Sequence, residues 1–339
     1  MSNYLDLFAQ YGSLFEFAFT QLLPGLLASL LLTNQKQIAE FNRTLLICTS
    51  IACIYGVITF LARRNPYVEN LTGSIIEASS WKGYSTSATF STTTAYGYFL
   101  TIILPYIIWL IDPRSNKRKK NLEYFTLVLS IIGIFLCRKR SVFITIAFDL
   151  LVLLFILPNT KKYFYRTIGC VTVFLIFTVA TSQIPGLQHL YNYIKASLLF
   201  FNDNAVQVSN GELGSTMALR ARQLDYPFTE ISNNPLLGHG FGWCSVYLSR
   251  FKLHPVLFGF ESIFALGICE FGILFFALYP LMYFLILKYY INCKTDKNKL
   301  IILFILSYIL NTIASGLNYF YLFVLLTVSI KKVLALVEK

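Results

Sequence analysis

Two pairs of closely spaced arginines have the composition of an anion-binding site. Arg138 and Arg140 flank Lys139, and Arg220 and Arg222 flank a single alanine. A guanidinium offers a planar fork of donors that contacts two phosphate oxygens at once, which a lysine ammonium does not do. The two pairs therefore favour a phosphate or pyrophosphate partner. Simpler explanations stay open: the first cluster could reach lipid headgroups, and the second could lie on a solvated helix face.

Two glutamates, Glu261 and Glu270, lie in an apolar stretch of the chain. An acid within an apolar helix is a functional hypothesis by default, because burying its charge is costly. The two are nine positions apart, about half a revolution on a helix, so they do not face one site if the helix is straight. For Glu270 a structural pairing with a cation or hydroxyl of another helix is an equal alternative.

A glycine series precedes these acids. Pro235 is followed by Gly238, Gly240 and Gly242, at alternate positions. Glycine has no side chain, so the backbone of such a segment can pass close to another chain or to a ligand. The series is not a dinucleotide-binding loop, because no strand precedes it. On its own this spacing is a weak signal.

The elements that must position these residues are apolar helices. The chain is 56% hydrophobic and only 13% charged, about half the charge of an ordinary soluble domain. Long stretches lack charge altogether, and a membrane requires a backbone that satisfies its own hydrogen bonds, which helices do. The net charge of +12 is best explained by topology, because the basic residues cluster between the apolar runs. A nucleic-acid partner is therefore not expected.

The sequence predicts an all-α polytopic membrane protein with roughly nine transmembrane helices. The expected spans are 15–33, 44–62, 93–111, 122–137, 141–158, 165–183, 260–287, 299–315 and 317–334. The basic cluster at 112–123 should be cytoplasmic, and alternation then places the later basic clusters inside as well. The segments 63–92, 138–140 and 182–259 fall outside.

Residues 1–339 are thus expected to form a single integral membrane domain in the cytoplasmic membrane. The segment 182–259, between spans six and seven, forms its large extracytoplasmic loop, with short helices inside it. One of these helices is predicted at 216–232, with a kink at Pro227.

Four motifs, in this order, resemble the O-antigen polymerase and O-antigen ligase family. The segment 86–105, TSATFSTTTAYGYFLTIILP, resembles the outer loop and helix of the family, and Arg140-Ser141 resembles its Ser-Arg turn, with Lys139 in place of the serine. Arg220 followed by Pro235-Leu-Leu-Gly-His-Gly-Phe-Gly is similar to the arginine and glycine motif. Glu270-Phe-Gly272 looks like the Glu-x-Gly motif. The match covers about residues 80–290, and the amino terminus is shorter than in most members.

The resemblance implies a metal-independent glycosyltransferase without a cofactor, acting on undecaprenyl-pyrophosphate-linked glycans outside the membrane. It implies that Arg140 and Arg220 are catalytic, with Arg138 and Arg222 as further pyrophosphate contacts. Glu261 is the candidate base, and Pro235, Gly238, Gly240, Gly242, Glu270 and Gly272 are expected to shape the site or position the glycan. Implied partners are membrane lipid and the chain-length regulator and flippase of the same pathway.

The expected activity is joining of lipid-linked repeats into O-antigen, capsular or exopolysaccharide. One alternative is a ligase that moves a finished glycan to lipid A core or protein, although the His-Asn pair of the family's ligase is replaced here by Glu261-Ser262. A transporter or flippase is an alternative of another class, but those proteins place their charges near the midplane and often have two similar halves.

Overall fold

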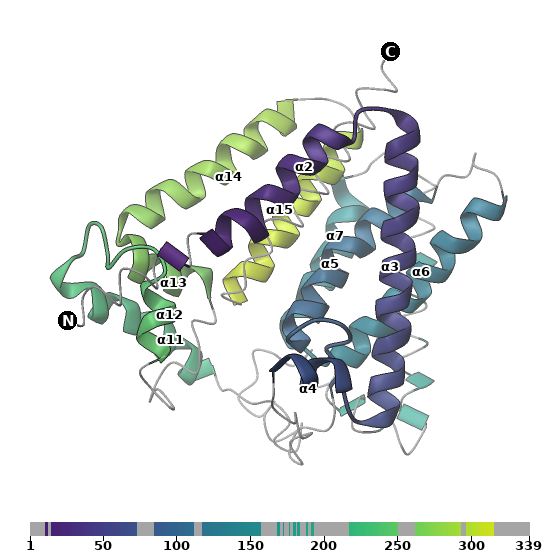
Figure 1. The fold of residues 1–339 in the computed structure, drawn as a ribbon, viewed down its shortest axis with the longest axis horizontal. Helices are drawn as coiled ribbons and strands as arrows, with labels where there is room; N and C mark the ends of the chain where they lie inside the picture. The colour runs from purple at the N-terminus through teal and green to yellow at the C-terminus, as the bar shows by residue number, and fades with distance from the viewer. Residues whose placement is uncertain are drawn as a thin grey trace. The chain divides into compact units, whose positions relative to one another are not determined.

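The computed structural model describes residues 11–12, 15–72, 85–111, 117–156, 217–249, 262–292 and 296–314, with single positions between 168 and 192. Every element in these ranges is a helix (Figure 1). The coarse expectation of an all-α protein is therefore confirmed for the described part of the chain. Most of the predicted span 165–183 and of the 182–216 segment lies outside the described residues, as do the whole of the span 317–334 and Glu261.

The chain divides into two compact units, each with its own set of helices. Unit 1 comprises residues 1–38 and 217–339, and unit 2 comprises residues 39–216. Unit 2 contains α3 (Gln35–Ala62, whose first turn belongs to unit 1), α4 (Pro66–Thr72), α5 (Thr93–Leu110), α6 (Lys117–Cys137) and α7 (Arg140–Ile156). Unit 1 contains η1 (Ala18–Leu22), α2 (Leu23–Leu31), α11 (Met217–Glu230), η3 (Ile231–Asn233), α12 (Trp243–Ser249), α13 (Ile263–Phe271), α14 (Leu274–Asn292) and α15 (Asp296–Ala314).

One helix in the described ranges, α3, is long and apolar enough to cross a membrane. It has 28 residues, a length of about 42 Å at 1.5 Å per residue. Shorter apolar helices occupy 15–31, 93–108, 121–137, 274–285 and 303–312. The count of roughly nine spans and the large outer loop stay predictions.

Several helix boundaries follow from local sequence. The predicted helix 93–111 corresponds to α5, which begins after Thr92, whose Oγ1 accepts a hydrogen bond from the Ala95 N–H at 3.0 Å. This is the usual capping role of threonine, which satisfies an otherwise unpaired donor of the first turn. The helix expected at 216–232 is also present as α11, with Pro227 inside it.

The prediction of one continuous helix over 260–287 is corrected by the structure. Within its described residues this segment forms two helices, α13 and α14, separated at Gly272. Gly272 has φ 63° and ψ −155°, a backbone conformation that is essentially restricted to glycine. The apolar pattern runs unbroken across this position, so hydrophobicity alone predicts a single helix.

Small residues allow the helices of unit 2 to pack closely. Tyr96 of α5 is fully buried and lies against Gly56 of α3 and Gly133 of α6. Gly97, the next residue of α5, faces Val142 of α7 so closely that an added Cβ would overlap the valine side chain. Glycines at such contacts let helix backbones approach, a feature also common in membrane helix packing.

Candidate functional site

Two of the three segments predicted to lie outside the membrane meet in unit 2. The Thr86 N–H donates to the carbonyl oxygen of Leu136 at 3.1 Å, which ties the loop before α5 to the last turn of α6. The Tyr98 hydroxyl of α5 donates to Ser141 Oγ of α7 at 3.0 Å. The loop 85–92 and the turn 138–140 therefore lie side by side, and their sidedness relative to a membrane stays a prediction.

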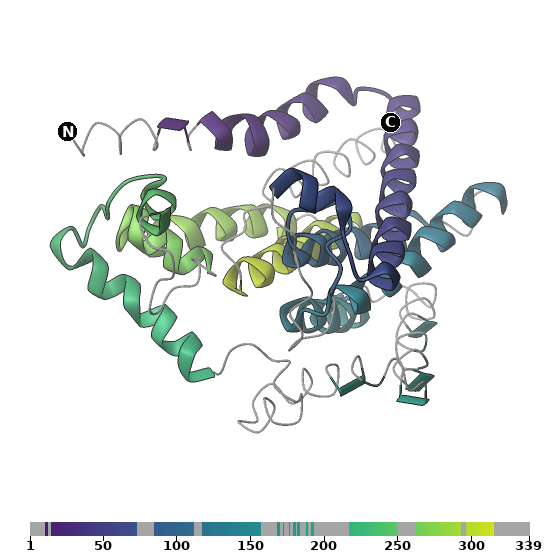
Figure 2. The same ribbon diagram turned by 60° about the horizontal axis from the view of Figure 1, so that its bottom comes forward.

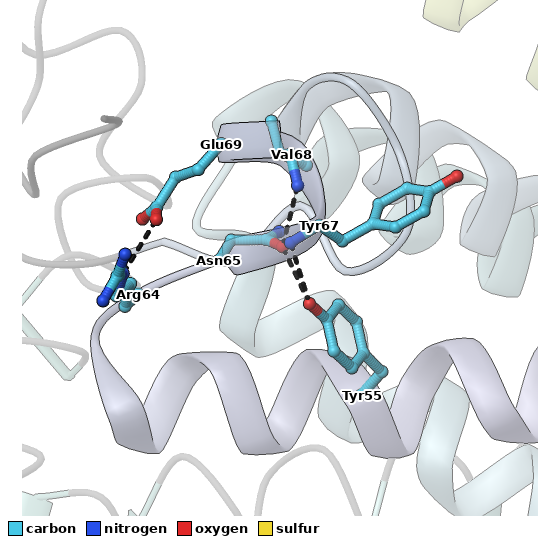
Figure 3. Close-up of polar contacts among 6 residues, drawn as sticks. All are labelled: Tyr55, Arg64, Asn65, Tyr67, Val68 and Glu69. Atoms are coloured by element: carbon cyan, nitrogen blue, oxygen red, sulfur yellow. Dashed lines mark hydrogen bonds and ion pairs between the residues drawn. The ribbon is translucent and has the colours of Figure 1, made fainter. Parts of the chain in front are cut away.

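Asn65 joins the end of α3 to the loop 85–92. Its side chain is 4% exposed and its amide donates to Ser87 Oγ at 3.0 Å and to the Ala88 carbonyl at 2.8 Å. Its Oδ1 accepts from the Tyr55 hydroxyl at 3.2 Å and from the Val68 N–H at 3.3 Å (Figure 3). Both amide hydrogens and both oxygen lone pairs are thus used, so this buried polar group is fully satisfied.

Two further contacts fix the same corner. The Tyr67 N–H donates to the Tyr55 hydroxyl at 3.3 Å, and Arg64 Nε pairs with Glu69 Oε2 at 2.7 Å (Figure 3). Sequence reasoning overlooked this corner. The signal was the dipeptide Asn65-Pro66, because asparagine is a favoured helix cap and proline a favoured first helical residue.

Replacing Asn65 by alanine is expected to destabilise unit 2. The substitution removes two buried hydrogen bonds of the Asn65 side chain, those with the Val68 N–H and with the Ala88 carbonyl. Removing one side of a buried hydrogen bond costs about 1–3 kcal/mol, so we expect a loss of about 2–4 kcal/mol in total. Thermal unfolding of the purified protein measures it, with the exposed Asn233→Ala as control, where a change within about 0.5 kcal/mol is expected. Equal midpoints for the two variants would contradict the role of Asn65.

The turn between α6 and α7 holds a buried arginine. Arg138 is 7% exposed and has φ 51°, an uncommon backbone conformation for a residue with a side chain. Its N–H donates to the Phe135 carbonyl at 3.3 Å, and the Phe143 N–H donates to the Lys139 carbonyl at 3.3 Å. Arg140 begins α7, but its side chain lies outside the described part. The turn that lies next to the loop 85–92 thus contains a buried, permanently charged arginine.

In unit 1 the residues 235–242, here called the glycine loop, bind the end of α13 through their backbone. The His239 N–H donates to the Cys269 carbonyl and the Gly240 N–H to the Glu270 carbonyl, both at 2.9 Å. In the opposite direction the Ile273 N–H donates to the Pro235 carbonyl at 2.8 Å. The backbone that the glycines approach is therefore the last turn of α13.

Glycine is required at two of these contacts. Gly238 has φ 66°, and a Cβ there would lie 2.6 Å from the Cys269 carbonyl oxygen. Gly272 has φ 63°, and a Cβ there would lie 2.6 Å from backbone atoms of Pro235 and Leu236. Gly240 and Gly242 also have positive φ, 95° and 79°. The expectation that these residues shape the site concerns their function and stays a prediction, but their structural role is clear.

Glu270 connects α13 to the start of α12. Its side chain is 3% exposed, and its Oε1 accepts a hydrogen bond from the Cys244 N–H at 3.4 Å. A carboxylate at this position interacts favourably with the unpaired N–H groups at a helix amino terminus. This contact is with a backbone N–H rather than with the cation or hydroxyl of the structural alternative, and a functional role of Glu270 stays a prediction. Burial raises the pKa of the neighbouring Cys244 thiol, which keeps it protonated.

The helix that carries Arg220 and Arg222 is anchored to the glycine loop. The Tyr226 and Tyr247 hydroxyls, of α11 and α12, are 2.9 Å apart, and His239 Nε2 lies 3.2 Å from the Glu230 carbonyl. Aromatic stacking continues this contact, with ring centroids 4.3 Å apart for His239 and Trp243 and 4.5 Å apart for Trp243 and Tyr247. In Figure 2, α11 and the segment after it form an arm that turns back onto α12 and α13.

The structure thus gathers part of the predicted site within each unit. Unit 1 assembles Pro235, Gly238, Gly240, Gly242, Glu270 and Gly272 around one junction. Arg222 is exposed on α11, whereas the Arg220 side chain and all of Glu261 lie outside the described residues. Unit 2 supplies the turn of Arg138 and Arg140.

No group of three or more His, Cys, Asp or Glu residues that could hold a metal ion occurs in the searched, described ranges. The expected independence from metal stays a prediction, since residues outside those ranges also contribute to the outer segments. Comparisons with protein-family models, with curated proteins and with solved structures find no match for this chain.

Proposed function

We propose that this chain is a multi-pass glycosyltransferase of the cytoplasmic membrane that joins undecaprenyl-pyrophosphate-linked oligosaccharide repeats on the outer face. The observation that supports this best is the buried Arg138 in the turn next to the loop 85–92. Both segments belong to the predicted outer face, so a pyrophosphate that approaches this turn would come close to a permanently charged guanidinium.

The chemistry is a displacement at the first sugar carbon of the growing chain. A hydroxyl oxygen of the next lipid-linked repeat attacks this carbon, the bond from carbon to the pyrophosphate oxygen breaks, and undecaprenyl pyrophosphate leaves. The hydroxyl proton passes to a base, for which we propose Glu261. Arginines that are already in place stabilise the charge that grows on the leaving group without a metal. We propose Arg138, Arg140, Arg220 and Arg222 as these contacts.

Deleting the gene and separating the surface polysaccharide on a gel tests the activity. If the chain is a polymerase, products longer than one repeat disappear while a single attached repeat remains. Loss of all attached glycan would point instead to a ligase or a flippase. An unchanged pattern of polysaccharide bands would contradict the polymerase, the ligase and the flippase assignments alike.

The outer placement can be tested by labelling single cysteines from outside the cell. On a cysteine-free background we expect a cysteine at position 208 to react with a membrane-impermeant reagent and one at position 117 to be protected, because the basic cluster beside 117 is retained in the cytoplasm. After permeabilisation both should react, which controls for burial. The reverse pattern in intact cells would overturn the topology.

Glu261 should matter more for chain extension than His254. A carboxylate at the membrane edge can accept the hydroxyl proton, and desolvation brings its pKa nearer to the working pH. We therefore expect Glu261→Gln to stop extension and His254→Ala to leave it nearly intact, measured as the length distribution of the polysaccharide at matched protein level. An inactive His254→Ala with an active Glu261→Gln would favour the ligase. Recovery of activity by exchanging the charges of Glu261 and Arg140 would instead indicate a structural ion pair.

A further inference from the structure

The glycine loop presents two leucines, Leu236 and Leu237, that unit 1 leaves uncovered. Their exposed fractions are 65% and 71%. The backbone around them is held in place, because the Pro235 carbonyl accepts from the Ile273 N–H at 2.8 Å and the Gly238 N–H donates to the Asn234 carbonyl at 2.9 Å. Two apolar side chains are thus kept in contact with the surroundings in a fixed position, which is unfavourable in water. We call these two residues the leucine tip.

The leucine tip is part of a larger apolar patch. It borders the start of α14, where Ile273, just before the helix, and Leu274, its first residue, are 49% and 41% exposed. On the other side of the junction, Phe276 of α14 stacks on Phe228 of α11 with ring centroids 6.0 Å apart, and both rings remain at least 40% exposed. Soluble proteins rarely expose contiguous patches of this kind unless a partner or a membrane covers them.

The patch continues without interruption along α14, which identifies the kind of partner. Residues further along this helix are also exposed, namely Leu278, Leu281, Phe284 and Leu285. An apolar surface that follows one helix from its first turn is what a bilayer covers, whereas a protein partner usually covers a bounded area with a polar rim.

We propose that the leucine tip inserts into the bilayer beside the first turn of α14, so that membrane lipid is the partner of the apolar patch. The tip then fixes the depth of the glycine loop and, through the contacts of His239 and Tyr226, the position of α11 at the membrane surface. The inference rests on the membrane placement of α14 in the proposed function. It does not depend on which reaction the protein catalyses.

Tryptophan fluorescence of the full chain in liposomes tests the proposal. Leu237→Trp and the control Asn233→Trp each add one fluorophore to an exposed position of the same segment. The three native tryptophans contribute equally to both variants and are subtracted with the wild-type signal. Each protein is reconstituted in phosphatidylcholine and in phosphatidylcholine with brominated acyl chains, and iodide serves as the aqueous quencher.

We expect the added emission of Leu237→Trp to be shifted to shorter wavelength, to lose most of its intensity in brominated lipid and to resist iodide. The added emission of Asn233→Trp should respond mainly to iodide. If iodide quenches Leu237→Trp while brominated lipid does not, the tip lies in water and the proposal is wrong. Protection from both quenchers would mean that protein covers the tip, which also overturns it.

Flotation of the liposomes separates this inference from the proposed function. A chain that floats with the vesicles but keeps the tip in water overturns the lipid contact alone. A chain that does not float overturns the membrane placement as well. The polysaccharide ladder reports on the reaction independently of either result.

Discussion

Replacing Arg140 or Arg220 by alanine is expected to abolish chain extension, with a fall of at least about a hundredfold in rate, the usual effect of removing one donor that stabilises developing negative charge. Lysine at either position should restore only part of the activity. The reason is geometric: lysine keeps the charge but lacks the planar fork that contacts two phosphate oxygens. The polysaccharide length distribution, at matched protein level in the membrane, measures the effect.

Arg43→Ala is the matched control for these variants. Arg43 is exposed on α3 and lies near the predicted cytoplasmic end of that helix, so its loss should leave extension unchanged. Full activity of a lysine variant at 140 or 220 would mean that only general charge is needed there. Normal extension by the alanine variants would remove these arginines from the site, and with them the main support for a pyrophosphate donor.

The second large effect is expected from alanine at Gly238 or Gly272. Either substitution places a Cβ 2.6 Å from backbone atoms of the facing segment, and both positions have positive φ. Backbone atoms of a hydrogen-bonded junction have little room to move, so strain and overlap together should cost about 2–5 kcal/mol. Since whole domains are stable by only about 5–15 kcal/mol, we expect lower protein levels and lower unfolding midpoints.

Gly12→Ala provides a control in the same unit. Gly12 is helical and has nothing within 4 Å of an added Cβ. There alanine should be neutral or stabilising by up to about 1 kcal/mol, because it is the better helix former. The same chemical change should therefore have opposite signs at Gly12 and Gly272. Midpoints for Gly238→Ala and Gly272→Ala that equal the wild-type value would contradict the close contact between the glycine loop and α13.

Local sequence determined the all-helical class and several helix boundaries. The apolar run 93–111 predicted α5 to within a residue, because an uncharged apolar stretch is a local signal. The glycine series likewise predicted a segment that can pass close to another chain or a ligand, and the structure shows it against the last turn of α13. The Asn65-Pro66 start of α4 could also be predicted from the sequence but was overlooked. The hydrogen bonds of Asn65 to Ser87 and Ala88 could not be predicted from it.

Only the tertiary structure determined which groups these residues contact. Whether Glu270 faces a ligand, a cation or a helix terminus depends on Cys244, 26 positions earlier in the chain. The break at Gly272 depends on the Pro235 carbonyl that accepts from the next residue, Ile273. Hydrophobicity, caps and glycine spacing are properties of a few neighbouring residues, so they predict where helices form and where a backbone can come close. The partner in each contact is set by the packing of distant helices, which no local pattern contains.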